Sequence, residues 1–263
     1  MVESDVISVV FCFSCLIYAS WLDIKSRSVT NWLWLLMIVV AIPFASYNLF
    51  IYRIPFLFSL LFSLTFTFAL SYLFFRLQLF GGADAKSLIC ISLLIPTHPD
   101  FHFFSLHFPI PLSLSLSLSL NAGFIPFPFA ISTLLNATIV TLIVSLALFF
   151  YNLPNLCLRH KGLRKNLGYM FIGYLLRIDE LTGVKHTRLV HSYAEKEGGD
   201  IEKKFLFGGV GIDEEEIEKL KSYAAAGKLD EEVWVTPDLP FMLFITAGFV
   251  ISILYVNFLF VFI

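Results

Sequence analysis

Carboxylates are rare in the apolar part of this chain, so the few that occur there are candidates for chemistry. Only eight acidic or basic residues fall between Val6 and Asn152, and three of them are aspartates: Asp23, Asp84 and Asp100. Two carboxyl groups that meet in apolar surroundings share one proton, because both cannot easily ionise. The ionised group then activates water, and the protonated group donates to a carbonyl or an amine. A pair of aspartates therefore predicts peptide hydrolysis with no metal and no cofactor.

A purely structural interpretation of these residues is also open from the charge positions alone. Lys25 follows Asp23 by two residues, and Lys86 follows Asp84 by two. Each aspartate would then pair with its lysine and anchor a helix end at the membrane interface. The choice between the two interpretations depends on whether the fold brings the aspartates together.

The composition places these residues in a membrane protein. Of the 263 residues, 58% are hydrophobic and 14% charged, whereas soluble domains are about half apolar and about a quarter charged. A run of about 20 apolar residues can cross a bilayer as a helix. Six segments are expected to do so, the fourth being short, and they cover residues 6–22, 31–51, 55–80, 83–96, 124–152 and 239–263. The net charge of −2 says nothing about nucleic acid, but no basic arm or aromatic-basic module supports such a partner, so none is expected.

Six spans also fix the direction of each helix. They place 17 of the 18 basic residues on one side of the membrane, with Arg53 alone on the other. Because short cytoplasmic loops are rich in lysine and arginine, that side is predicted to be cytoplasmic. Asp23 then ends the first helix and Asp84 begins the fourth, at the same face, whereas Asp100 falls outside. The prediction is a multi-pass plasma-membrane protein whose site and large polar loop face the cytoplasm.

The remaining charge is concentrated before the last apolar segment. Residues 155–237 hold 27 of the 38 acidic and basic residues. This stretch is expected to form an α+β unit with a helix at 213–226, strands at 185–193 and 233–236, and a glycine turn at 208–211. The predicted fold class is an α-helical integral membrane protein of six transmembrane helices with a small α+β cytoplasmic insertion before the last helix. The domains are residues 1–154 with both aspartates, the insertion at 155–237, and the last helix at 238–263.

The cysteines and histidines do not predict a metal site. Cys12 and Cys15 form a CxxC, but inside an apolar helix and without a second pair, so they are expected to be core residues. His98 and His102 have a spacing that metal ligands use, but they lie among prolines and phenylalanines, which favours a loop.

Three stretches resemble one family of membrane proteases. Gly81-Gly82-Ala83-Asp84-Ala85-Lys86 resembles the GxGD-type motif, in the GGAD-x-K form of type IV prepilin and archaeal preflagellin peptidases. Residues 23–31 are similar to the first catalytic stretch of that family, with Thr30 where many members have proline. Residues 234–242 are similar to the segment that leads into the last helix of preflagellin peptidases.

The resemblance implies a membrane aspartyl endopeptidase with Asp23 and Asp84 as its catalytic pair. The residues expected to bind substrate or shape the site are Gly81, Gly82, Lys25 and Lys86, although a helix break explains the glycines and membrane topology explains the lysines equally well. The implied partners are the lipid bilayer and membrane-anchored flagellin- or pilin-like precursors, whose short basic leader is removed at the cytoplasmic face. Bacterial prepilin peptidases that also methylate usually carry a zinc-binding CxxC pair, which is missing before the first helix. The prediction is therefore a peptidase without methyltransferase activity.

Two alternatives stay open at this point. One is an intramembrane protease of the signal-peptide-peptidase kind, but such enzymes typically place tyrosine before the first aspartate and set it deep in a span, whereas Leu22 precedes Asp23. The other is a non-enzymatic transporter with interfacial carboxylates, which would predict internal repeats and polar residues near mid-membrane.

Overall fold

The computed structural model describes residues 2–77, 79, 81–99, 128–158, 167–184, 186–195 and 201–255. Predictions that concern His102, Asp100 or residues 256–263 lie outside these residues. The chain divides into two compact units, which are described separately. The helical unit comprises residues 1–141 and 240–263, and the polar unit comprises residues 142–239.

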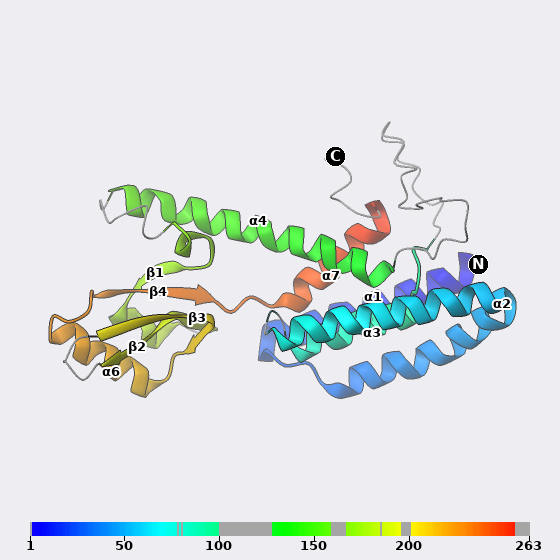
Figure 1. Ribbon diagram of the computed structural model, residues 1–263, viewed down its shortest axis with the longest axis horizontal. Coiled ribbons are helices and arrows are strands. Elements are labelled where there is room, and N and C mark those ends of the chain that lie inside the picture. Colours follow the sequence, from blue (N-terminus) through cyan, green and yellow to red (C-terminus); the bar gives the residue numbers. More distant parts are fainter. Residues whose placement is uncertain are drawn as a thin grey trace. The chain divides into compact units, whose positions relative to one another are not determined.

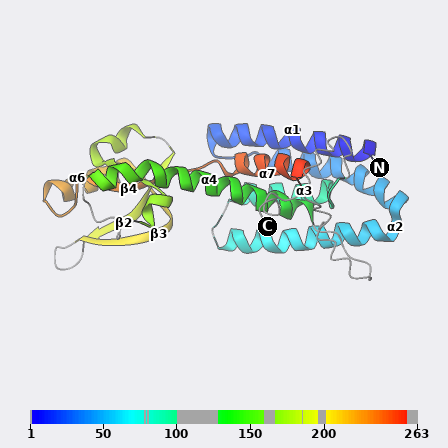
Figure 2. The same cartoon turned by 90° about the horizontal axis from the view of Figure 1, so that it is seen from above.

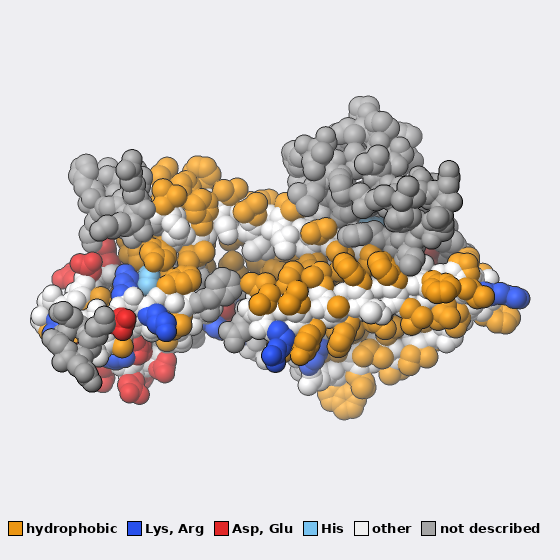
Figure 3. Space-filling view, in the orientation of Figure 1, with side chains coloured by type: hydrophobic (Ala, Val, Ile, Leu, Met, Phe, Trp, Pro, Cys, Tyr) orange, Lys and Arg blue, Asp and Glu red, His pale blue; other side chains and the backbone are white. Residues whose placement is uncertain are grey.

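The helical unit is built from long apolar helices and two shorter ones (Figure 1). They are α1 (Val2–Ser26), α2 (Asn31–Arg76), α3 (Gly82–Leu94), the first part of α4 (Phe129–Leu158) and α7 (Phe241–Tyr255). Figure 2 shows α1 and α7 running side by side, and these two helices contact each other closely. Large apolar side chains such as Phe50 and Trp32 point outwards from the unit, and they cover much of the face shown in Figure 3. An exposed apolar surface of this extent is typical of contact with lipid.

Helix α2 reverses its direction near its middle. Its 46 residues would measure roughly 70 Å if straight, more than twice the thickness of the hydrocarbon core. The helix breaks at Arg53, whose φ of 52° and ψ of −130° are not helical, and Pro55 follows. Proline and a residue in this conformation both interrupt helical hydrogen bonds. The break falls between the predicted segments 31–51 and 55–80, and Figure 1 shows the two arms.

Three described helices are long and apolar enough to cross a membrane: Asp5–Ser26 of α1, all of α2, and Phe129–Pro154 of α4. Helix α7 is equally apolar but shorter over its described residues, and α3 has 13 residues. The protein is therefore mostly helical and of membrane type. The count of six spans stays a prediction.

Close packing joins α4 to α7 within the helical unit. A Cβ atom at Gly248 would collide with the backbone of Thr133 and Ala137, so only glycine allows this approach. The amide Nδ2 of Asn136 donates to Ser252 Oγ at 2.8 Å, and both residues are buried. Small residues and buried polar pairs are characteristic of helix contacts inside membranes.

The polar unit contains a four-stranded antiparallel sheet in the order β1-β4-β2-β3. Its elements are β1 (Tyr174–Arg177), β2 (Thr187–Glu195), β3 (Ile201–Gly211), β4 (Glu232–Pro237), α6 (Glu214–Ala225) and the short helices Tyr169–Phe171 and Ile178–Gly183. The predicted helix at 213–226 and strands at 185–193 and 233–236 correspond to α6, β2 and β4. Strands β1 and β3 were not predicted.

The predicted glycine turn at 208–211 is instead an irregularity inside β3. Leu189 pairs with Val210, but His191 pairs with Phe205, so β3 has extra residues opposite β2 at this point. Gly208 and Gly209 take positive φ angles of 96° and 72°, which glycine adopts without strain. The glycines therefore mark a local backbone irregularity within a strand, and the prediction of a turn at this point was wrong.

The polar unit has a core on either side of its sheet. One includes Leu189, Val233 and Val235 together with α6 and the Ile178–Gly183 helix. The other joins Met170, Val190 and Trp234, against which Phe149 and Leu153 of α4 pack. Asn152 of α4 is buried beside this second core. Its Nδ2 donates to the carbonyls of Gly173 at 2.7 Å, Leu148 at 2.8 Å and Met170 at 3.1 Å.

Candidate active site

Asp23 lies in the last turn of α1, where its carboxylate reaches another helix. Its Oδ2 accepts a hydrogen bond from the backbone N–H of Met242 at 3.3 Å. Met242 is the second residue of α7, and the first N–H groups of a helix have no partner within that helix. A negatively charged acceptor is stabilised there by the helix dipole as well as by the hydrogen bond. Asp23 is therefore held by the first turn of α7.

Asp84 lies in the first turn of α3 and is almost fully buried, with 7% of its surface exposed. Its Oδ2 accepts a hydrogen bond from the backbone N–H of Gly81 at 2.9 Å. This contact closes the start of α3, because a carboxylate three residues into a helix can reach back to the capping residue. The local sequence Gly-Gly-Ala-Asp thus fixes the carboxylate next to the loop that precedes α3.

The fold brings the two aspartates near each other inside the helical unit. Asp23 lies near the end of α1 and Asp84 in the first turn of α3, and these two helices are in contact. Two carboxyl groups that approach closely titrate as a pair. Such a pair can hold one proton and offer one base, which is the arrangement that hydrolysis of a peptide bond requires.

The two lysines next to the aspartates have other partners. Lys86 Nζ donates to Asn31 Oδ1 at 2.7 Å, and Lys25 Nζ lies 5.0 Å from the ring centre of Trp21. These contacts do not involve the aspartates, so they favour an interpretation in which the lysines and the aspartates have separate roles.

The two glycines before Asp84 differ in what they allow. A Cβ at Gly81 would lie 3.4 Å from Asp84 Oδ2, whereas a Cβ at Gly82 would lie 3.8 Å from the ring of Phe75. Gly81 has a φ of −79°, which any residue can adopt. What distinguishes Gly81 is therefore its small size beside the Asp84 carboxylate rather than its backbone freedom.

No cluster of three or more histidine, cysteine, aspartate or glutamate residues that could hold a metal ion is found among the described residues. Cys12, Cys15 and Cys90 are buried free thiols in the helical core. His98 has Ser132 as a partner, with Nε2 and Oγ 2.8 Å apart.

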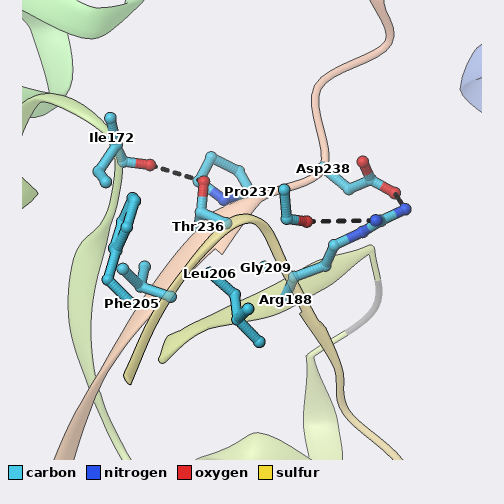
Figure 4. A pocket seen from close by; sticks show the side chains of 10 residues that line it. Ile172, Arg188, Phe205, Leu206, Gly209, Thr236, Pro237 and Asp238 are labelled. Carbon is cyan, nitrogen blue, oxygen red and sulfur yellow. Dashed lines mark hydrogen bonds and ion pairs between the residues drawn. The ribbon is translucent and has the colours of Figure 1, made fainter. Parts of the chain in front are cut away.

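A pocket lies in the polar unit, beside the irregularity in β3 (Figure 4). It has a volume of about 270 Å³, and its walls include Phe205, Leu206 and Thr236. Its acidic group, Asp238, is already paired, since Arg188 Nη2 lies 3.3 Å from Asp238 Oδ2. The pocket therefore has one neutralised carboxylate and no carboxylate pair, so the aspartates of the helical unit are the better candidates for hydrolysis.

Comparison with known proteins decides the family. The sequence model of the type IV leader peptidase family matches residues 10–146, which is more than half of the chain and includes both aspartates. The chain belongs to the type IV leader peptidase family. A second model, described as the archaeal peptidase A24 C-terminus type II, matches residues 165–257. These matches confirm the predicted resemblance. They also confirm the prediction that the chain belongs to a family of proteases.

Two relatives of this leader peptidase match along nearly its whole length. The preflagellin peptidase of Methanococcus voltae is 27% identical over 240 residues, which is 90% of each chain. The preflagellin peptidase of Methanococcus maripaludis (strain C6 / ATCC BAA-1332) is 26% identical over 240 residues, again 90% of each chain.

Several groups near Asp23 in this leader peptidase were missed by sequence reasoning. The Met242 amide is a backbone group with no sequence signature, and it lies 219 residues from Asp23. Ser20 and Thr246 are paired across 226 residues and look like ordinary small polar residues in apolar helices. Arg27 lies within residues 23–31, the stretch that resembles the family's first catalytic motif. Its positive φ of 53° and its buried Nε and Nη1, which have no hydrogen-bond partner among the described residues, were not foreseeable.

Proposed function

We propose that this protein is a membrane aspartyl endopeptidase that removes short basic leader peptides from preflagellin (archaellin) or type IV prepilin-like precursors. Both named relatives are preflagellin peptidases and match 90% of the chain. The observation that carries the aspartyl mechanism is the position of Asp23 and Asp84 on two helices that contact each other, inside the region that matches the family. Each carboxylate is also held by a backbone N–H at a helix start.

In the proposed mechanism the two aspartates share one proton and hold a water molecule between them. The ionised carboxylate removes a proton from the water as its oxygen attacks the scissile carbonyl carbon, and the protonated carboxyl donates to the carbonyl oxygen. Gly81 leaves room for an extended substrate backbone beside Asp84. Lys25 and Lys86 shape the surrounding helix ends through Trp21 and Asn31. No cofactor takes part, and no methyl group is transferred.

The proposed setting is the cytoplasmic face of the plasma membrane. Six spans, with residues 155–237 as a cytoplasmic insertion, place the helix ends that carry Asp23 and Asp84 on that side. A precursor anchored by its own apolar helix would then present the bond before that helix to the aspartates. The reactive centre is at the membrane surface, where water is available.

Cleavage of a purified precursor tests this function directly. The detergent-solubilised protein is incubated with a preflagellin precursor, once with a chelator of divalent metals and once without. We expect a single shortened product whose new N-terminus is the residue before the apolar helix, unmethylated, in both conditions. A precursor with its basic leader residues replaced by alanine serves as the matched control and should be cut more slowly. Failure to cut flagellin-like and pilin-like precursors alike would contradict the proposal.

A further inference from the structure

The hydrogen bond between Asp23 and Met242 belongs to a larger polar contact between α1 and α7. Ser20 Oγ donates to the carbonyl of Met242 at 3.0 Å and lies 2.7 Å from Thr246 Oγ1. Thr246 Oγ1 also reaches the carbonyl of Leu16 at 3.2 Å and that of Met242 at 2.9 Å. Ser20 and Thr246 are buried. Hydroxyl groups on both helices therefore fix the first turn of α7 against α1, next to Asp23.

This contact sets the position of one backbone amide. A buried hydroxyl pair of this kind resists sliding of one helix along the other, because a slip would leave polar groups unpaired in apolar surroundings. The Met242 N–H therefore stays aimed at Asp23 Oδ2. The donor is a main-chain group, which keeps its place when the side chain of residue 242 changes.

Helix α1 packs against α2, α3 and α7, and the charged groups near the relevant ends of these helices are few. Helix α1 itself supplies Lys25 and Arg27, and Lys25 lies over Trp21. Helix α3 supplies Asp84 and Lys86, and Lys86 is bonded to Asn31. Helix α2 has Arg76 in its last turn. Helix α7 has no titratable side chain from Phe241 to Leu254, so its first turn acts on Asp23 through its backbone.

We propose that the first turn of α7 is a third part of the active site, in which the Met242 amide, held by Ser20 and Thr246, orients Asp23 as the base. The inference rests on the proposed function, since it assigns different roles to the two aspartates. A backbone N–H donor favours the ionised form of both carboxylates, and the half-buried Asp23 meets a smaller desolvation cost than the buried Asp84. Asp84, which is almost fully buried, keeps the shared proton.

The assignment gives each proton a definite path. Asp23 takes a proton from water as the water oxygen bonds to the carbonyl carbon, and Asp84 gives its proton to the carbonyl oxygen. As the C–N bond breaks, Asp23 returns its proton to the leaving nitrogen. Asp84 recovers a proton from one hydroxyl of the intermediate, which becomes the new carboxylic acid. One water and one peptide bond are consumed, and both aspartates end as they began. Met242, Ser20 and Thr246 are positioning residues in this scheme.

Replacing Met242 by proline removes the N–H donor. Proline fits the first turn of a helix, where it costs no internal hydrogen bond. Met242→Ala is the matched control, because it removes the buried side chain and keeps the N–H. With preflagellin as substrate in detergent, we expect Met242→Pro to have a kcat about ten- to one-hundred-fold below that of Met242→Ala, the loss typical of a hydrogen bond to a charged group. KM should match, and the acidic limb of the pH–rate profile should lie about one pH unit higher.

A second variant tests the same idea without altering the backbone. Thr246→Val keeps the side-chain volume and removes the hydroxyl, so it should lower kcat several-fold with a smaller displacement of the acidic limb in the same direction. Ser252→Ala is the control, because it also removes a buried hydroxyl from α7 but one that bonds Asn136. It should leave the pH–rate profile unchanged.

The outcomes separate this inference from the proposed function. If Asp23→Asn and Asp84→Asn both abolish cleavage while Met242→Pro and Met242→Ala have equal kcat and pH profiles, the role of α7 is refuted and the aspartyl mechanism stands. Equal effects of Thr246→Val and Ser252→Ala on the pH profile would likewise refute it. If Asp23→Asn cleaves normally, the proposed function itself fails.

Discussion

At the scale of residues, the site depends on which atoms surround each carboxylate. Asp23 and Asp84 carry the same functional group, but one is bonded to a neighbouring helix and the other to the start of its own. Their lysine neighbours are occupied elsewhere. The two aspartates therefore differ in the helix start whose N–H group each one accepts, and in burial.

The two glycines before Asp84 provide a matched pair of substitutions. In Gly81→Ala the new methyl group would lie 3.4 Å from Asp84 Oδ2 and partly cover it, whereas in Gly82→Ala it would lie 3.8 Å from Phe75. We expect Gly81→Ala to lower kcat/KM by about tenfold, since displacing a reacting group slightly is costly. Gly82→Ala should keep its activity and gain about 0.5 kcal/mol of stability, because alanine favours a helix. Steady-state cleavage of preflagellin and thermal unfolding measure both effects, and equal activity of the two variants would contradict this account of Gly81.

Protonation of His191 should make the stability of the polar unit depend on pH. Burial, followed by the positive charge of Lys203, lowers the pKa of this histidine to about 4. Its ring is 2% exposed. Above about pH 6.5 the side chain is neutral in both the folded and the unfolded chain, so it contributes no pH dependence there. As the pH falls from about 6.5 to about 4, only the unfolded chain takes up the proton, so the unit should lose up to about 3 kcal/mol.

This loss can be followed by limited proteolysis of the full-length protein across that pH range. His191→Gln lacks the titrating group and should show a flatter dependence between pH 6.5 and pH 4. An unchanged slope in this variant would show that other groups cause the acid sensitivity.

At the scale of elements, α4 is the helix on which the polar unit depends. Its second part packs Phe149 and Leu153 against the sheet, and Asn152 donates to the carbonyls of Met170 and Gly173. The segment from Gly168 to Gly173 has little regular structure of its own, so these bonds define its path. The apolar helix thus serves both units, with its first part in one and its second part in the other.

Removing the Asn152 amide should loosen this attachment. Asn152→Leu leaves two buried carbonyls without their donor, which typically costs about 1–3 kcal/mol for each unsatisfied group. Protease sensitivity of the chain near Met170 should rise. Thr182→Ala is the control, since it removes an exposed hydrogen bond to Asp179 of the same unit and should have little effect. Equal sensitivity of both variants would contradict the role given to Asn152.

At the scale of the whole molecule, hydropathy and charge predicted most of the architecture. The break at Arg53, the polar unit with β2, α6 and β4, and the candidate aspartates all follow from apolar runs, proline and rare charges. Strand β3 was not predicted because it combines charged residues with Gly208 and Gly209 and lacks a regular alternation of apolar and polar residues. Strand β1 has only four residues, too few for a pattern. The contact between Asp23 and α7 joins a side chain to a main-chain amide across 219 residues, and no local sequence feature records it.

The most direct test of the account is cleavage by single-aspartate variants. Wild type, Asp23→Asn, Asp84→Asn and the control Asp100→Asn are purified in detergent and incubated with a preflagellin precursor, and release of the leader is followed by gel. Because asparagine keeps the shape and removes the proton chemistry, we expect Asp23→Asn and Asp84→Asn each to lose about a thousandfold or more in rate. Asp100→Asn should cleave like wild type. Wild-type activity in either Asp23→Asn or Asp84→Asn would contradict the aspartate pair.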